Sequence, residues 1–476
     1  MADHYDLVIL GSGSTAFAAA LKAQELGKTA VMTEHRTIGG TCVNRGCLPS
    51  KNLIEAAKLL HEARHPRYPG LSPCDMAMNF RELIGQKDEV VHGYRKKKYE
   101  SLLGGRFGIE HGPVRFVDPH VVEVDGKRLS GDKMLVATGS HAFIPDIPGL
   151  ADGPYLTSDL LSVDEAVELV EQPRSLLILG AGYIALELGQ MFQRFGTPVT
   201  ILERSEQVLA HGYEPEVGPA IARVLAEEGV QIVTGASVAS VRYEEGEVAA
   251  ITTLGGKQRE FRAKRLLVAT GRRPSTGEIG LDRADVAIND RGEVQVDRHL
   301  RTTVPHIFAA GDVIGVQIDS QPATPVGARQ GGMAVHNALT DAPMQEFDGR
   351  VIPRTIFTDP QIATVGMTEV EAIAAGHRCW CSTIPMSLVP RAGAIRDTRG
   401  IIKMVADADT DEVLGVSMVG HNAGEVIHEA AMALRYRAKL PDFVDLLHVF
   451  PTMAEALKIV AISRTKDPAK LSCCAE

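Results

Sequence analysis

The stretch Gly39-Gly-Thr-Cys42-Val-Asn-Arg-Gly-Cys47-Leu-Pro-Ser-Lys51 places two cysteines five positions apart, after an apparent dinucleotide-binding unit. Its glycines allow a tight turn and a close approach of the backbone to a flat ring, and Pro49 marks a bend. A thiol reacts as the thiolate, and a helix N-terminus or the cation of Lys51 would lower its pKa. We interpret the two cysteines as a redox pair. Buried structural cysteines, or half of a zinc site, are the alternatives.

A strand, a glycine turn and a helix precede this stretch. The apolar run 6–10 ends at a turn containing Gly11, Gly13 and Ala16, an Ala-rich helix follows to about residue 26, and the next strand ends at Glu34. In such a unit the helix N-terminus binds a pyrophosphate and the acidic residue binds ribose hydroxyls. The order of elements predicts a dinucleotide site.

The same order returns further along the chain. A second apolar run leads into Gly180 and Gly182, and its following strand ends at Glu203. The spacing from glycine to acid is 34 − 11 = 23 in the first unit and 203 − 180 = 23 in the second. Two such sites imply two nucleotides, most simply a bound flavin dinucleotide and a diffusible nicotinamide dinucleotide.

The composition bounds the class of protein. The 476 residues predict roughly three domains, and a net charge of −10 argues against nonspecific binding of nucleic acid. Seven cysteines in this length do not make a disulfide scaffold. The chain enters a strand within a few residues and has no long uncharged apolar run, so we expect a cytoplasmic protein. Residues 51–104 look helical, and the run 95–98 reads as a solvated helix face.

The stretch 39–51 closely resembles the segment GGTCxNxGCxPSK of the flavin-dependent disulfide reductases, the pyridine nucleotide-disulfide oxidoreductase family. The resemblance implies two doubly wound, Rossmann-like α/β domains and an α+β dimerisation domain. It implies FAD and a nicotinamide dinucleotide as cofactors. The FAD-binding domain would be 1–150 with a return segment at 276–346, the NAD(P)H-binding domain 151–275 and the dimerisation domain 347–476.

Several site residues follow from the same resemblance. Lys51 and Glu187 resemble the ion pair beside the flavin, and Tyr183 resembles the gate over the nicotinamide pocket, although simple packing of this ring is the alternative. Asp312 lies in a run similar to the second flavin motif, where the aspartate accepts hydrogen bonds from the ribityl chain. The predicted cofactor-binding residues are Gly11, Gly13, Ala16, Glu34, Gly40, Thr41, Lys51, Thr138, Gly139, Gly180, Gly182, Glu203, Arg204, Gly271, Gly311 and Asp312.

The sequence departs from the family where organic disulfides are reduced. Those members carry a His-Pro-Thr-x-x-Glu string whose histidine protonates a departing thiolate in the partner subunit. Here Phe450 takes the place of that histidine, and phenylalanine transfers no proton. His448 remains two residues earlier, and Glu455 reads as a packing or surface residue. This departure argues against a dithiol substrate.

The C-terminal tail carries the adjacent thiols Cys473 and Cys474, which suit a soft cation such as Hg(II). With the segment around Cys42 and Cys47, this tail resembles that of the mercuric reductases. The resemblance implies a homodimer whose shared active site reduces Hg(II), delivered as a thiol complex, to elemental mercury. All four thiols would bind the ion. That family often has an N-terminal metal-binding domain that this sequence does not contain, which leaves the delivery of Hg(II) open.

Alternatives remain in substrate and cofactor. The protein could reduce another disulfide or metal, or bind mercury without turnover. Glu203 favours NADH, whereas Arg204 beside it favours the 2′-phosphate of NADPH, and the resemblance favours NADPH. Cys379 and Cys381 alternate as on one face of a strand, and we read them as structural rather than metal-binding.

Overall fold

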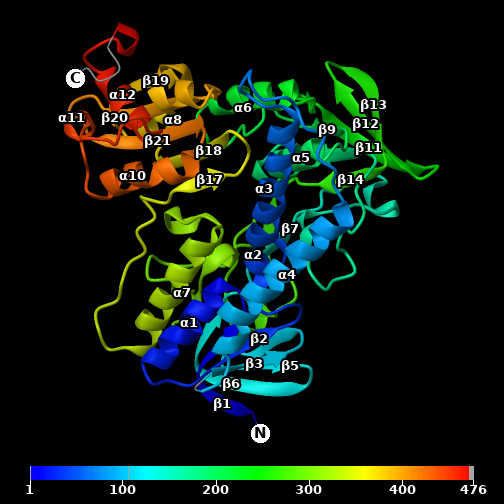
Figure 1. Cartoon of the computed structure of the whole chain (residues 1–476). Helices are drawn as coiled ribbons and strands as arrows, with labels where there is room; N and C mark the ends of the chain where they lie inside the picture. The colour runs from blue at the N-terminus through cyan, green and yellow to red at the C-terminus, as the bar shows by residue number, and fades with distance from the viewer. Residues whose placement is uncertain (1, 106, 471–476) are drawn as a thin grey trace.

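The computed structural model describes residues 2–105 and 107–470, arranged as three sheet-based parts (Figure 1). The first part holds the N-terminus, the second is built on strands drawn in green, and the third ends near the C-terminus. The tail residues Cys473 and Cys474 lie outside the described residues. Among the described helices, none combines the length and apolar character needed to cross a membrane.

The first part is a sheet of order β3-β2-β1-β6-β5-β4, with β16 paired to β6. Leu10 at the end of β1 lies opposite Thr33 and Val136 in parallel pairings, so three carboxyl ends meet at one edge. The strands are β1 (Asp3–Leu10), β2 (Ala30–Glu34), β3 (Phe107–His111), β4 (Val114–Asp118), β5 (Val121–Val124), β6 (Lys127–Val136) and β16 (Ile307–Ala309).

Two helices pack closely beside this sheet, α1 (Ser14–Glu25) and α7 (Thr324–Leu339). A Cβ at Gly327 or Gly331 of α7 would lie 2.4 or 2.2 Å from atoms of Thr15. Glycine at these positions therefore allows the backbones to approach each other.

The cysteines lie on helices that leave this sheet. They are α2 (Gly40–Arg45) and α3 (Cys47–Arg64), followed by α4 (Phe80–Lys98) and the 3₁₀ turn η1 (Glu100–Leu102). The prediction of helix throughout 51–104 was wrong for 65–79, where three prolines and Gly70 disfavour helical backbone. Pro49 lies in the first turn of α3, where proline costs no hydrogen bond, rather than at a bend.

The second part has a parallel sheet of order β10-β9-β8-β14. An antiparallel sheet, β11-β12-β13, projects beside it (Figure 1). Its elements are β8 (Leu176–Leu179), α5 (Tyr183–Arg194), β9 (Val199–Leu202), α6 (Val217–Glu227), β10 (Gln231–Val233), β11 (Ser237–Glu244), β12 (Glu247–Leu254), β13 (Lys257–Ala263) and β14 (Arg265–Val268).

Short elements connect these two parts. The strands β7 and β15 pair with each other between the first and second parts. The connecting elements are β7 (Ser140–Ala142), η2 (Leu150–Asp152), η3 (Ser158–Leu161), β15 (Arg272–Pro274), η4 (Leu281–Ala284), η5 (Gly311–Ile314) and η6 (Gln317–Asp319).

The third part is an antiparallel sheet of order β17-β18-β21-β20-β19 with helices around it. The fold class predicted from the sequence, two doubly wound α/β units and an α+β part, is confirmed. The elements are β17 (Arg354–Ile356), β18 (Gln361–Gly366), α8 (Glu369–Ala374), β19 (Cys379–Pro385), η7 (Met386–Leu388), α9 (Pro390–Ala394), β20 (Ile401–Asp407), β21 (Val413–Gly420), α10 (Ala423–Arg435), α11 (Leu440–Asp445), α12 (Glu455–Ile462) and η8 (Pro468–Lys470).

Candidate active site

Cys42 and Cys47 lie on either side of the break between α2 and α3. Gly39 has a left-handed φ of 93° that starts α2, and Gly46 ends it. A Cβ at Gly46 would come within 3.0 Å of the Thr41 carbonyl oxygen, so the tight break requires glycine. Both thiols are free; Cys42 is half-buried and Cys47 is exposed. The break thus presents both thiols of the predicted pair at one place.

The two thiols have opposite electrostatic surroundings. A hydrogen bond from the Cys42 thiol lowers the pKa of Cys47 to about 6, against burial, and the charge of Lys51 lowers it further. The same hydrogen bond, with burial, raises the pKa of Cys42. Thr324 Oγ1, at the start of α7, lies 4.0 Å from Cys47 Sγ. Cys47 is therefore the thiolate of the pair at neutral pH, and Cys42 keeps its proton.

Lys51 and Glu187 join all three parts of the molecule next to the cysteines. Lys51 Nζ lies 2.7 Å from Glu187 Oε2, as the sequence predicted, and 4.8 Å from the centre of the Phe357 ring. Glu187 Oε1 accepts a hydrogen bond of 2.8 Å from the Phe357 backbone N–H. Because Glu187 is only 4% exposed, this ion pair is held in one geometry.

Tyr183 is the first residue of α5 and is 46% exposed. Its hydroxyl lies within electrostatic reach of Cys47 and Asp312. Asp312 itself accepts a hydrogen bond of 2.7 Å from Ser140 Oγ, which Arg272 holds through a bond of 2.9 Å to the same oxygen. The exposed ring is not packed in a core, and its role as the gate over the nicotinamide pocket stays a prediction.

The first glycine turn fits a dinucleotide. A Cβ at Gly11 would lie 2.4 Å from the Ala137 carbonyl oxygen, and one at Gly40 would lie 2.8 Å from Gly13 Cα. Glu34, only 8% exposed, accepts bonds of 2.5 Å from Ser12 Oγ and 2.7 Å from the Arg36 N–H. Among the described side chains none caps α1, so its first N–H groups can bind a phosphate.

The second glycine turn repeats this arrangement in a more open form. A Cβ at Gly180 would lie 2.6 Å from the Ala269 carbonyl oxygen. Glu203 is half-buried and accepts bonds of 2.7 Å from the Ala181 N–H and 2.8 Å from the Ser205 N–H. Arg204 is exposed and forms no ion pair with any residue that the structure describes. Its guanidinium can therefore donate hydrogen bonds to a phosphate group of a ligand.

The other predicted cofactor-binding residues lie around these two turns. Thr138 Oγ1 donates a bond of 2.8 Å to the Ser275 carbonyl oxygen beyond β15. Gly139 and Gly271 have φ values of 71° and 121° at the ends of β6 and β14, where side chains would be strained. A Cβ at Gly311 would lie 2.5 Å from Thr15 Oγ1. The remaining three are Ala16, which is fully buried, Thr41, which is half-buried, and Gly182, which precedes the first residue of α5.

A set of ion pairs that the sequence did not reveal fixes the cysteine helix. Arg45 of α2 is 6% exposed and donates a bond of 2.7 Å to Glu165 Oε1, and Glu165 also binds Arg36. Arg95 Nη1 donates a bond of 3.2 Å to Asn44 Oδ1. Arg95 is thus not part of a solvated face, whereas the three lysines after it are exposed. The spacing along the chain gave no signal for these pairings because they join distant segments.

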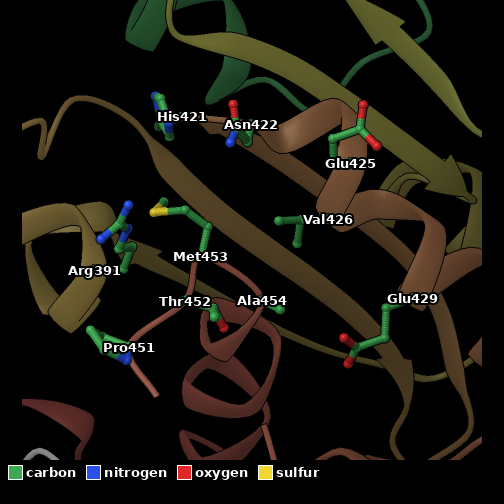
Figure 2. A pocket seen from close by; sticks show the side chains of 10 residues that line it. All are labelled: Arg391, His421, Asn422, Glu425, Val426, Glu429, Pro451, Thr452, Met453 and Ala454. Carbon is green, nitrogen blue, oxygen red and sulfur yellow. The ribbon is translucent and has the colours of Figure 1, made fainter. Parts of the chain in front are cut away.

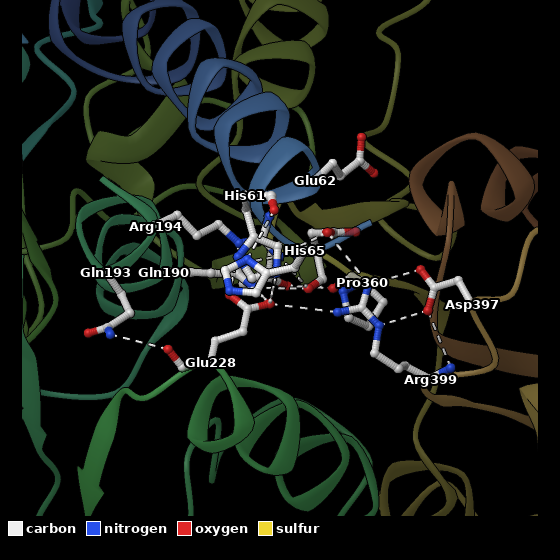
Figure 3. A network of polar contacts seen from close by, with 12 residues as sticks. His61, Glu62, His65, Gln190, Gln193, Arg194, Glu228, Pro360, Asp397 and Arg399 are labelled. Atoms are coloured by element: carbon white, nitrogen blue, oxygen red, sulfur yellow. Dashed lines mark hydrogen bonds and ion pairs between the residues drawn. The ribbon is translucent and has the colours of Figure 1, made fainter. Parts of the chain in front are cut away.

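A second polar network holds the far ends of α3 and α5 (Figure 3). Arg194, the last residue of α5, lies 2.6 Å from Glu228 Oε1 and 2.9 Å from Asp359 Oδ2. Arg399 of the third part donates a bond of 2.7 Å to Asp397. Burial and neighbouring charge lower the pKa of His61, on α3, to about 4. The far end of α5, the helix that carries Glu187, is therefore held by Glu228 and by the third part.

The segment with Phe450 borders a cavity of about 560 Å³ in the third part (Figure 2). His448, two residues earlier, lies 2.9 Å from Glu429 Oε1, and its side chain is almost fully buried. Glu455 Oε2 accepts a bond of 3.0 Å from the Thr452 N–H, so it stabilises the start of α12. Around this segment lie exposed apolar side chains, namely Met432, Tyr436, Leu446, Leu447, Val449 and Phe450.

Two dinucleotide turns, a cysteine pair beside the first and a Lys–Glu pair between them define a class: oxidoreductases that couple a flavin, a nicotinamide and a thiol pair. Comparison with known proteins agrees. Residues 5–342 match the family described as pyridine nucleotide-disulphide oxidoreductase, and residues 352–461 match the dimerisation domain of that family. The chain belongs to the pyridine nucleotide-disulphide oxidoreductase family, in the branch that contains the mercuric reductases.

That branch is shown by near full-length relatives. The mercuric reductase of Streptomyces lividans is 41% identical, with 99% of this chain and 98% of that protein covered. The mercuric reductase of Bacillus cereus is 39% identical over 99% of this chain and 73% of its own length. Among solved structures, the HOCl-induced flavoprotein disulfide reductase RclA of Escherichia coli has a TM-score of 0.83 at 29% identity, covering 97% of this chain and 100% of the other.

Proposed function

We propose that this protein reduces Hg(II) to elemental mercury with NADPH, through FAD and the Cys42–Cys47 pair. The observation that carries the proposal is the pair itself, placed between two dinucleotide turns in a chain similar over almost its whole length to mercuric reductases. FAD and NADPH are the cofactors of this family. When bound, FAD supplies two-electron transfer between the nicotinamide and the thiols. The net reaction is Hg(II) and NADPH to elemental mercury, NADP⁺ and a proton.

Different parts of the chain bind the cofactors, form the dimer and carry the thiol chemistry. Residues 1–150 and 276–346 bind FAD, 151–275 bind NADPH and 347–476 form the dimer. Cys47 holds the thiolate next to the flavin position, and Cys42 is the exchange thiol. When a thiol-bound ion arrives, Cys42 gives its proton to the departing thiolate as its sulfur bonds the ion. The reaction belongs in the cytoplasm, where NADPH is regenerated.

Phe450 supports an ion as the substrate. Reduction of an organic disulfide needs a group that protonates the leaving thiolate. Phe450 cannot do so, and Nε2 of His448 is engaged by Glu429 at 2.9 Å. Reduction of Hg(II) needs no such acid.

The dimer and the tail complete the proposal. The exposed apolar residues around Phe450 support a subunit contact, and the match to the dimerisation domain supports a homodimer. We place Cys473 and Cys474 at the active site of the other subunit, where they take Hg(II) from small thiols and pass it to Cys42 and Cys47. The variant Cys473→Ala/Cys474→Ala should lose turnover of thiol-bound Hg(II) but keep reduction of the flavin by NADPH.

Mixed dimers test the shared site. Heterodimers of that tail variant with Cys42→Ala/Cys47→Ala contain one intact site and should recover activity. Inactive heterodimers, after verified subunit exchange, would show that the tail acts within its own subunit. Normal turnover of thiol-bound Hg(II) by the tail variant would show that the tail has no part in transfer.

Substrate comparison tests the function itself. NADPH oxidation should be steady with Hg(II) in excess thiol and negligible with oxidised glutathione or lipoamide. Rapid turnover of either disulfide would instead favour a disulfide reductase. Binding of Hg(II) without NADPH oxidation would favour a mercury-binding protein.

A further inference from the structure

Cys379 and Cys381 lie on the same face of β19, the edge strand of the third sheet. Their cross-strand partners on β20 are Asp407 and Val405. The other face of β19 packs against the end of α12, where Ser463 Oγ donates a bond of 2.7 Å to Ser382 Oγ. Both thiols are free and half-buried, so an ion can reach them from the edge of the sheet.

A cluster of carboxylates surrounds this thiol face. Lys403, itself almost fully buried, lies 2.9 Å from Glu214, 3.0 Å from Glu216 and 2.8 Å from Glu369. One cation is thus shared by three carboxylates. Besides burial, the Glu369 carboxylate also raises the pKa of the nearby Cys381 thiol. The surroundings favour a bound cation over two bare thiolates.

In contrast to the structural role that the sequence suggested, we propose that Cys379 and Cys381 form a second mercury site, in which the two sulfurs bind one Hg(II) ion in a line. Soft sulfur ligands select soft cations, and Hg(II) is satisfied by two of them. This inference goes beyond the proposed function, because it requires neither NADPH nor reduction at Cys42 and Cys47. No group of three or more His, Cys, Asp or Glu side chains among the described residues is arranged to hold a metal, and a linear site needs only two.

The strand geometry suits such a site. Residues i and i+2 of a strand are about 6.8 Å apart, and two metal–thiolate bonds of about 2.3 Å span about 4.6 Å. Each sulfur must lean about 1.1 Å toward the other, which is less than one Cβ–Sγ bond. A change of χ1 rotamer at a strand edge supplies this movement.

The charge balance is also favourable. Burial, with the Glu369 carboxylate, raises the pKa of Cys381 to about 12, and burial with the same carboxylate raises the pKa of Cys379. Both groups are therefore thiols until an ion binds. When Hg(II) arrives with two monothiol ligands, each cysteine proton passes to a departing thiolate, and two sulfur–mercury bonds replace two. No atom is oxidised or reduced, and the bound complex is neutral.

A chain with only these two thiols tests the proposal. In the full-length FAD-loaded protein, serine replaces Cys42, Cys47, Cys74, Cys473 and Cys474, so that two of the seven cysteines remain. Mercuric chloride is added, excess glutathione is dialysed through, and retained mercury is measured by mass spectrometry. We expect one ion per chain, both thiols blocked to a thiol reagent, and sulfur-to-mercury ultraviolet absorbance.

A matched control tests whether mercury binding requires both thiols on one face of β19 or only two thiols on the strand. In the same background, Cys381→Ser/Ser382→Cys again has two thiols, but on opposite faces of β19. Because a chelate gains an effective concentration that two single thiols lack, this control should lose mercury at a glutathione concentration about 10²-fold lower. Equal retention by both proteins, or loss of mercury from both at the same concentration, would overturn the proposal. Absorbance of bound FAD reports that both are folded.

Failure of this site and failure of the proposed function are distinguishable. Cys379→Ser/Cys381→Ser in the otherwise natural chain should lose one bound ion per subunit but keep NADPH-dependent reduction of Hg(II). If this variant binds as many ions as the parent protein, the second site does not exist, whatever its turnover.

Discussion

The glycine turns at Gly11 and Gly180 have the same backbone arrangement but differ in the side chains around them. Each of these glycines donates a backbone hydrogen bond to the neighbouring strand. Gly11 N–H bonds the Thr33 carbonyl oxygen at 3.2 Å, and Gly180 N–H bonds the Leu202 carbonyl oxygen at 2.8 Å. A Cβ atom added to either glycine would meet a carbonyl oxygen, that of Ala137 or that of Ala269. In the first turn the acidic residue is buried and bound by a serine hydroxyl, whereas Glu203 in the second is half-buried and bound by backbone alone.

The basic residues after the two acids differ in the same sense. Arg36 pairs with Asp159, at 2.9 Å, and with Glu165, whereas Arg204 is exposed and has no ion-pair partner in the described part of the chain. In the first turn the charged side chains are bound by other side chains of the protein. In the second turn the polar groups remain available to a ligand. This is what a resident flavin and a diffusible nicotinamide require.

The largest effect should come from the cysteines that only the first unit carries. Cys47→Ser should lower turnover of Hg(II) by about 10³-fold or more, because it removes the thiolate that we propose to lie next to the flavin. It should also abolish the long-wavelength charge-transfer absorbance of the partly reduced protein. Cys42→Ser should show that band without full reduction. Its absence there would reverse the roles of the two thiols.

Matched alanine substitutions should separate the two turns. Each places a Cβ on a carbonyl oxygen at positive φ, at a cost of about 1–3 kcal/mol, so each should disturb its own dinucleotide. Gly11→Ala should lose FAD on gel filtration, whereas Gly180→Ala should keep FAD but be reduced slowly by NADPH. Gly85→Ala in α4 is the control for folding, because this glycine lies outside both turns and no described atom lies within 4 Å of its added Cβ. Loss of FAD from Gly180→Ala would contradict the assignment of the first turn to FAD and the second to NADPH.

Arg204→Gln should lower kcat/KM for NADPH by about tenfold, or about 1.4 kcal/mol, and leave NADH unchanged. Arg36→Gln serves as the counterpart, and we expect it to reduce stability by at most about 1 kcal/mol without changing coenzyme choice. Steady-state rates with both coenzymes measure the effect. A tenfold preference of the unaltered protein for NADH would contradict the assignment of Arg204.

The smallest expected effect is on pH dependence. The pKa of Cys47 is depressed from about 9 to about 6, so its contribution to stability is complete above pH 9 and is lost as the pH falls through 6. The charge-transfer absorbance should follow the same thiolate, with a midpoint near pH 6. Lys51→Gln should move the midpoint upward, since the charge of Lys51 lowers this pKa. An unchanged midpoint would show that the charge of Lys51 does not lower this pKa.

The sequence predicted what depends on local spacing. The glycine turns, the acidic strand ends and the cysteine pair could be read from motifs, because their backbone conformations require particular residues at fixed intervals. The Lys51–Glu187 contact joins residues 136 positions apart and was predicted only from the resemblance to the family. The ion pair of Arg45 with Glu165 could not, because it joins residues 120 positions apart without a motif. The same holds for Arg95, whose neighbours suggested a solvated run although it contacts Asn44.

The most direct test of the central claim is the yield of elemental mercury per NADPH. Mercury vapour is swept from the reaction and measured while NADPH absorbance is followed, with Hg(II) supplied in excess thiol. We expect one mercury atom released for each NADPH oxidised, and none from Cys42→Ser/Cys47→Ser, which still binds both dinucleotides. NADPH oxidation without mercury release, or equal release from that variant, would contradict the account.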